Sequence, residues 1–152
     1  MITTLLAVGK LRPTFQVACD EYLARLRRYG GVVACEVREA PASASPPEQR
    51  RIEAKRILDK IPERSLVVAL DRTGTGWTSQ ALAGHLGRWR EGGKPVALLI
   101  GGSTGLDETA LARADHRWSL GPLTLPHQLA RLVVLEQWYR AWTILRGEPY
   151  HK

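Results

Sequence analysis

Apolar and polar positions along this chain change period repeatedly, from runs typical of strands to the three- or four-residue spacing typical of helices. Apolar runs predict strands at residues 2–8, 32–37, 65–70, 96–100 and 117–120. Helical spacing predicts helices over residues 14–28, 48–61, 79–89 and 126–146, with a short helix after Gly105. The runs at 65–70 and 96–100 are continuous, which predicts strands buried on both faces of a parallel sheet.

The alternation of strands and helices predicts an α/β fold in which a mostly parallel sheet is flanked by helices. The 152 residues suit a single domain, residues 1–152, without an internal linker. Ligands of such folds bind beyond the carboxyl ends of the strands. We therefore expect the ligand-binding loops to follow Leu70, Ile100 and Leu120. The Pro-rich segment 39–48 is the candidate for a mobile loop.

Composition argues against several classes of protein. Hydrophobic residues make up 44% and charged residues 24% of the chain, values typical of a soluble globular protein. No apolar run approaches the ~20 residues that span a bilayer, so no membrane association is expected. The N-terminal run has no preceding basic region, unlike a signal peptide. Cys19 and Cys35 form no CxxC pair and lack metal-type neighbours, which predicts reduced thiols, a cytoplasmic location and no metal.

The net charge of +7 favours a polyanionic partner. Lys and Arg side chains that neutralise phosphates release bound counterions, which drives association with nucleic acid. The alternative is that arginine is simply frequent in this sequence. Charge alone does not choose between these two explanations.

A glycine-rich loop follows the strand at 96–100, in the sequence Leu99-Ile100-Gly101-Gly102-Ser103-Thr104-Gly105-Leu106. Glycine allows the backbone to approach a ligand and to adopt positive φ. The spacing is not the GxGxxG of dinucleotide-binding folds, which disfavours a nicotinamide oxidoreductase, and no Lys-Ser or Lys-Thr completes a P-loop. Taken alone, the loop is equally compatible with a ligand site and a tight turn.

A second candidate ligand segment spans residues 118–127. Leu120, Leu123 and Leu125 offer apolar surface, and prolines at 122 and 126 stiffen the backbone. An apolar slot with free backbone groups suits an adenine ring. The alternative is a structured loop before the last helix.

The last predicted helix carries charge on an apolar stripe. The stripe consists of Leu129, Leu132, Val133, Glu136 and Arg140. Glu136 and Arg140 are one turn apart and are expected to pair, either as partners on a buried face or as an ordinary surface pair.

Aromatic residues crowd the same helix at Trp138, Tyr139 and Trp142. We expect them to cover a partner surface formed by a second subunit, with core packing as the alternative. His85 and His116 are expected at the surface without a functional role.

The chain ends in Glu148-Pro149-Tyr150-His151-Lys152. An aromatic ring, an imidazole and an ammonium group together could stack on a base and contact a phosphate. The alternative is a frayed terminus.

These motifs together resemble one known family, the ribosomal RNA large-subunit methyltransferase H family of the SPOUT superfamily. Single motifs are weak, but their combination and order are specific and cover nearly the whole chain. The residues that carry the resemblance are Ala7-Val8-Gly9-Lys10, Glu21-Tyr22, Leu98 to Gly102, Leu123 to His127, Tyr139 to Trp142 and Pro149 to Lys152.

The resemblance implies an S-adenosyl-L-methionine-dependent methyltransferase that modifies N3 of a pseudouridine in 23S ribosomal RNA within the ribosome. It also implies a homodimer and a C-terminal trefoil knot, of which composition and periodicity give no sign. Two alternatives remain: a SPOUT enzyme for another RNA, such as transfer RNA, and a non-catalytic ribosome-binding factor. Cofactor binding would separate the enzymes from the binding factor.

The resemblance also implies roles for individual residues. The expected cofactor-binding residues are Leu70, Gly101, Gly102, Leu120, Gly121, Pro122, Leu123, Thr124 and Leu125. The expected catalytic residues are Glu136, Arg140, Tyr150 and His151. His151 and Glu136 are the candidate general bases, and Arg140 would counter developing negative charge or hold a phosphate. Ser103-Thr104 stands where some members carry Pro-Glu, so an acid expected in that loop is missing.

Overall fold

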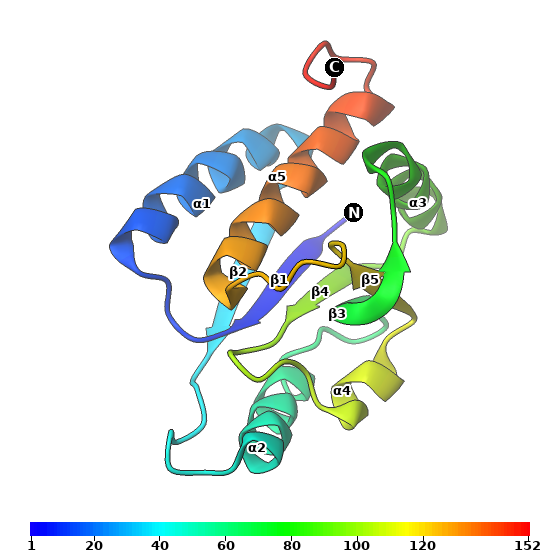
Figure 1. The fold of residues 1–152 in the computed structure, drawn as a ribbon. Helices are drawn as coiled ribbons and strands as arrows, with labels where there is room; N and C mark the ends of the chain where they lie inside the picture. The colour runs from blue at the N-terminus through cyan, green and yellow to red at the C-terminus, as the bar shows by residue number, and fades with distance from the viewer.

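A five-stranded parallel sheet forms the centre of the protein, in a computed structural model that describes all 152 residues (Figure 1). The strands lie in the order β2-β1-β4-β3-β5, and every adjacent pair is parallel. Their bounds are β1 Thr3–Val8, β2 Val32–Val37, β3 Leu66–Gly76, β4 Val96–Ile100 and β5 His116–Ser119. The predicted α/β fold with a flanked parallel sheet is thus confirmed, while the C-terminal knot stays a prediction.

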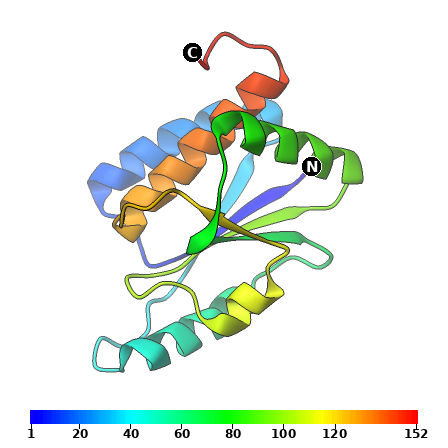
Figure 2. The same cartoon turned by 45° about the vertical axis from the view of Figure 1, so that its right-hand side comes forward.

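Helices cover both faces of the sheet, as Figures 1 and 2 show. One face carries α1 (Pro13–Leu26), α3 (Ser79–Gly92) and α5 (His127–Leu145), with α5 packed between the other two. The opposite face carries α2 (Pro46–Leu58) and α4 (Glu108–Arg113). A short 3₁₀ helix, η1 (Arg27–Tyr29), follows α1. No helix is long and apolar enough to cross a membrane.

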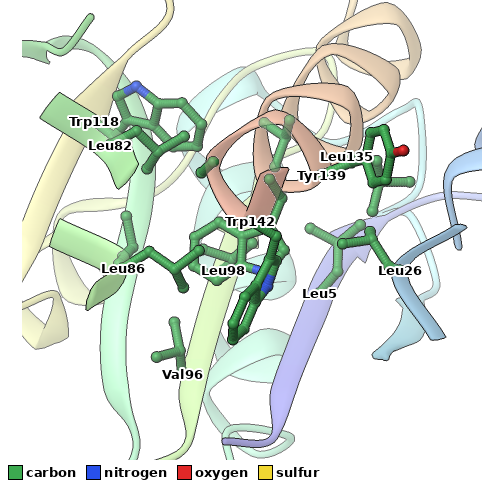
Figure 3. Packing of buried hydrophobic residues seen from close by; sticks show 14 of the residues in the cluster. Leu5, Leu26, Leu82, Leu86, Val96, Leu98, Trp118, Leu135, Tyr139 and Trp142 are labelled. Carbon is green, nitrogen blue, oxygen red and sulfur yellow. The ribbon is translucent and has the colours of Figure 1, made fainter. Parts of the chain in front are cut away.

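Alternation along the central strands divides the core into two layers. Leu5 and Ala7 of β1 point to the side of α1, α3 and α5, whereas Leu6 and Val8 point to the side of α2 and α4. Successive strand side chains face opposite sides of a sheet, so a continuous apolar run contributes buried side chains to both core layers. The layer under α5 is much the larger, with 21 buried residues against 8 (Figure 3).

The aromatic residues of α5 are core residues, so the expectation that they form a partner surface is wrong. Trp138 is completely buried, and Tyr139 and Trp142 are nearly so. Trp142 stacks parallel on Tyr29 with ring centroids 5.4 Å apart. Because α5 lies between α1 and α3, most of its circumference faces protein, and its large rings fill the layer above the sheet (Figure 3).

The histidines expected at the surface are half-buried among tryptophans. The His85 ring centroid lies 4.3 Å from that of Trp77 and 5.4 Å from that of Trp89, and His116 contacts all three rings. Burial lowers the pKa of His85, and the positive charges of Arg88 and His116 lower it further. Cys19 and Cys35 are free thiols, as predicted.

Two predicted boundaries differ from the structure for identifiable reasons. The strand expected to end at Leu70 continues through residues 71–76 as part of β3, because Thr75 and Gly76 pair with Trp118 and Ser119 beyond a register shift. Helix α2 begins at Pro46 rather than at residue 48, since the Ser45 hydroxyl accepts a hydrogen bond from the Glu48 N–H at 3.4 Å and caps it.

Candidate active site

The three loops that follow β3, β4 and β5 meet at one edge of the sheet and enclose a cavity of about 480 Å³. This is the convergence expected at the carboxyl ends of parallel strands. Eight of the nine residues expected to bind a cofactor line the cavity, and the exposed Pro122 does not. The lining also includes Arg50 from α2, Asp71 to Thr73, Ser103 to Leu106, Trp118, His127 and Ala130.

The loop after β4 requires glycine because its own ends approach closely. A Cβ on Gly101 would lie 2.5 Å from the carbonyl carbon of Gly105. Gly105 has φ +86°, and its N–H donates to the Gly102 carbonyl at 3.0 Å. We expected Gly101 to leave room for a ligand; the room is instead occupied by the other end of the loop. The tight closure shapes the cavity wall, so the glycine acts through the loop itself.

Helix α2 supports this loop through a residue that the sequence pattern did not single out. Glu53 is only 7% exposed. One carboxylate oxygen accepts the Ala40 N–H at 2.9 Å, while Oε1 is buried without a partner, 3.0 Å from where a Gly102 Cβ would lie. Arg50, one turn earlier, lies 3.4 Å from the Thr104 carbonyl. The sequence predicted this helix but not its buried acid; the four-residue spacing of Glu53 and the buried Ile57 was the available signal.

The rim of the cavity carries both polar and apolar side chains. Asp71 accepts hydrogen bonds from the N–H and the hydroxyl of Thr73, and the Arg72 guanidinium lies 3.4 Å from the Thr124 hydroxyl. Leu123, by contrast, is 77% exposed beside the cavity. A large apolar side chain at the mouth of a cavity is suited to contact with a ligand or a second chain.

The four expected catalytic residues form one hydrogen-bonded cluster at the other end of α5. Glu136 Oε1 accepts from Arg140 Nη2 at 2.7 Å and from the Tyr150 hydroxyl at 3.0 Å. Arg140 Nη1 lies 3.1 Å from His151 Nδ1. We call these four residues the tail cluster. The terminus is therefore folded back onto α5, and the frayed alternative does not describe this structure.

Hydrogen bonding in the tail cluster engages both ring nitrogens of His151. A guanidinium can only donate, so Nδ1 accepts from Arg140, and Nε2 lies 3.0 Å from the side-chain amide nitrogen of Gln80. The hydrogen bond to Glu136 raises the pKa of Arg140. Burial, with hydrogen bonds to Tyr22 and Glu136, raises the pKa of Tyr150 well above its usual value. Tyr150 is thus a hydrogen-bond donor at neutral pH.

The cavity and the tail cluster occupy separate parts of one chain. Ala130 is the last residue of α5 that lines the cavity, and Glu136 and Arg140 lie six and ten residues further along the helix. At 1.5 Å per residue these separations along the helix axis are about 9 and 15 Å. Figure 1 shows the two ends of α5 at opposite ends of the sheet. The structure therefore brings the expected cofactor residues together and the expected catalytic residues together, but not the two groups to each other.

The parallel sheet, the cavity at its carboxyl edge and the glycine loop fit the class of SPOUT methyltransferases. The chain matches the family described as "Predicted SPOUT methyltransferase" over residues 1–151, and it belongs to that family. Solved structures of the same fold include a probable methylase family protein from Haemophilus influenzae Rd KW20, with a TM-score of 0.56 at 15% identity, which covers 99% of this chain and 70% of that one.

Curated relatives are similar over almost the full chain. One from Anaeromyxobacter sp. (strain Fw109-5) is 49% identical over 149 residues, which cover 97% of each chain, and is named Ribosomal RNA large subunit methyltransferase H. A protein of the same name from Rubrobacter xylanophilus is 49% identical, and the match covers 97% of this chain and 96% of that one. Another from Chromohalobacter salexigens is 42% identical, and the match covers 97% of each chain. The resemblance noted in the sequence is thereby confirmed.

Proposed function

We propose that this protein transfers a methyl group from S-adenosylmethionine to N3 of a pseudouridine in 23S ribosomal RNA within the ribosome. The observation that carries the proposal is the convergence of the three strand-end loops on one cavity, in a chain whose relatives are named as ribosomal RNA methyltransferases. The +7 charge is consistent with an RNA substrate. Such a substrate would be met in the cytoplasm.

The cavity fits S-adenosylmethionine in size and chemistry. Its volume of about 480 Å³ lies within the ~300–1,000 Å³ usual for small-molecule sites. Leu120, Leu123 and Leu125 offer an apolar wall for an adenine, and the loops at 101–105 and 120–125 offer backbone donors and acceptors. When bound, this cofactor supplies an electrophilic methyl group. The residues of the cavity hold and orient it.

Tail-cluster residues supply the proton chemistry. The N3 imide proton must leave as the new bond forms, and a neutral imidazole is suited to accept it. We assign this role to Nε2 of His151, which contacts only the side-chain amide of Gln80, whereas Glu136 already accepts from both Arg140 and Tyr150. The fixed Arg140 guanidinium, held by Glu136, is placed to stabilise negative charge that develops on the base.

The separation of about 9 to 15 Å along α5 between cavity and tail cluster supports a homodimer in which one protomer's tail completes its partner's active site. The aromatic residues of α5 are buried in the protomer, so they do not form the interface. The half-buried stripe of Leu129, Leu132 and Val133 on α5 is the better candidate. It runs from the cavity end of the helix toward Glu136, as a contact between two antiparallel copies would require.

The decisive experiment compares ribosomal RNA from cells with and without the gene, by mass spectrometry of nuclease fragments. We expect one methylated pseudouridine in 23S RNA to disappear in the deletion strain and to return with the wild-type gene. Purified protein with labelled cofactor should restore it on deletion-strain ribosomes. Methylation of transfer RNA instead, or unchanged ribosomal RNA in the deletion strain, would overturn the proposal.

A further inference from the structure

All cation–π contacts of this protein lie at one end of the molecule, on a single connected group of aromatic rings. The group comes from α1, η1, α5 and the tail, and we call it the aromatic cluster. Neighbouring ring centroids are 4.8 to 6.1 Å apart. Its members are Tyr22, Tyr29, Tyr139, Trp142 and Tyr150.

Four exposed arginines cover the aromatic cluster, and we call them the arginine group: Arg25, Arg28, Arg90 and Arg146. Arg28 and Arg146 both contact the ring of Tyr29, with guanidinium carbons 5.3 and 5.9 Å from its centroid. Arg25 lies 5.3 Å from the Tyr22 centroid. Contact through the central carbon leaves the N–H donors at the periphery of each guanidinium available for other partners.

Carboxylates neutralise only part of the arginine group. Arg25 pairs with Glu21. Arg28 makes one long contact with Glu148 at 3.4 Å, and the other oxygen of that carboxylate accepts from the Tyr29 hydroxyl at 2.6 Å. Arg90 and Arg146 have no ion pair. The surface therefore combines excess positive charge with unused donors on side chains that aromatic contacts hold in place.

We propose that the arginine group binds the RNA backbone that flanks the target nucleotide. Planar guanidiniums match phosphate geometry, and side chains already held against rings lose less freedom on binding. The group is continuous with the tail cluster, because Arg140 lies over Tyr150 at 4.8 Å and Tyr150 packs against Tyr139. Structured RNA is recognised largely through its backbone and shape, so such contacts position the substrate without reading sequence.

This inference rests on the proposed ribosomal substrate, and its test is a binding measurement that does not depend on methyl transfer. The variant is R28Q/R146Q, which removes both charges over Tyr29. Its affinity for purified ribosomes is measured as a function of salt concentration. Each lost phosphate contact should lower the slope of log K against log salt by about 0.7 to 0.9, so we expect a reduction of about 1.4 to 1.8. At ~0.15 M salt the affinity should fall roughly tenfold or more.

The matched control is R51Q/K55Q, which removes the same charge from exposed positions on α2, on the opposite face of the sheet. It should leave the salt slope nearly unchanged, and R28K/R146K should recover most of the affinity. Cofactor affinity and, if the enzyme is active, kcat should match wild type in R28Q/R146Q, while KM rises.

Three results would overturn the proposal. Equal losses in the variant and the α2 control would mean that net charge alone matters. A lower unfolding temperature with an unchanged salt slope would mean that the arginines only stabilise the fold. Conversion of a dimeric protein to monomers would make this surface an interface between copies. If wild type binds ribosomes with the expected slope but methylates nothing, the proposed function fails while this inference stands.

Discussion

The cavity and the tail cluster use different parts of the residues that form them. The cavity is made largely of backbone: Gly101 and Gly105 permit a tight loop, and the run from Leu120 to Leu125 offers amide groups and apolar surface. The tail cluster is made of charged and polar side-chain groups on Glu136, Arg140, Tyr150 and His151. A binding site built from backbone depends on steric fit, whereas a proton-transfer site depends on the chemistry of single atoms. Mutations in the cavity should therefore impair cofactor binding, whereas mutations in the tail cluster should impair methyl transfer.

Removal of Tyr150 to Lys152 should have the largest effect on activity. The truncation deletes the proposed base and the Tyr150 hydroxyl that binds Glu136, so we expect methyl transfer to fall by about 10²–10⁴-fold or more. Cofactor affinity should remain within about twofold of wild type, because no tail residue lines the cavity of its own chain and the partner's tail is proposed to act on the RNA base. Single-turnover kinetics on ribosomes and titration calorimetry measure the two quantities. Deletion of Lys152 alone is the control, and wild-type rates in the longer truncation would transfer the role of base to Glu136.

Gly101→Val should act primarily on cofactor affinity, in contrast to the truncation, which spares it. Its branched side chain cannot fit where a Cβ already lies 2.5 Å from Gly105, so the loop must open. We expect S-adenosylmethionine affinity to fall about 100-fold or more, with a loss of stability of about 1–3 kcal/mol from overpacking. Calorimetry and thermal unfolding measure these changes. Gly92→Ala is the matched control, since nothing lies within 4 Å of its new methyl group. A folded Gly101→Val protein with unchanged affinity would remove this loop from the cofactor site.

Mixing the two inactive variants tests whether the regions belong to different protomers. A dimer of one tail-truncated chain and one Gly101→Val chain contains one site with an intact cavity and an intact tail. Random exchange of subunits should then restore about a quarter of wild-type activity. The assay is methyl transfer after a denaturation–renaturation cycle, with each variant treated alone as control. No recovery despite confirmed mixed dimers would mean that cavity and tail act within one chain, and the separation between them would then have to close by movement.

The smallest expected effect is on tyrosine ionisation. Burial and the Glu148 contact raise the pKa of Tyr29 to about 12, and that of Tyr150 is raised as well. A group whose pKa is raised in the folded state contributes stability below its unfolded pKa of ~10 that is lost as pH rises through the folded value. Stability should therefore decline between pH 10 and 12. Absorbance of tyrosinate should show delayed ionisation in wild type, with part of the delay absent in Tyr150→Phe.

The different construction of the two regions also explains what could be predicted. The rule that ligands bind beyond the carboxyl ends of parallel strands predicted the three cavity loops, because continuous apolar runs and glycines are local signals. It missed Glu53 and Arg50, which support the glycine loop from a helix about fifty residues away. The strand expected to end at Leu70 continues, because pairing with Trp118 and Ser119 extends β3. Each error involves a contact between segments distant in sequence, which local periodicity does not encode.

By itself, the sequence determined the order of strands and helices, the parallel character of the sheet and the family to which the chain belongs. Hydrophobic periodicity and glycine placement are local properties, and local steric preferences are enough to express them. Only the tertiary structure decided that Trp138, Tyr139 and Trp142 are core, because the same stripe of rings suits a partner or the chain's own sheet. The tertiary structure alone decided that the tail folds onto Glu136 and Arg140, about 9 to 15 Å along α5 from the cavity, since helix length converts a sequence interval into a physical separation.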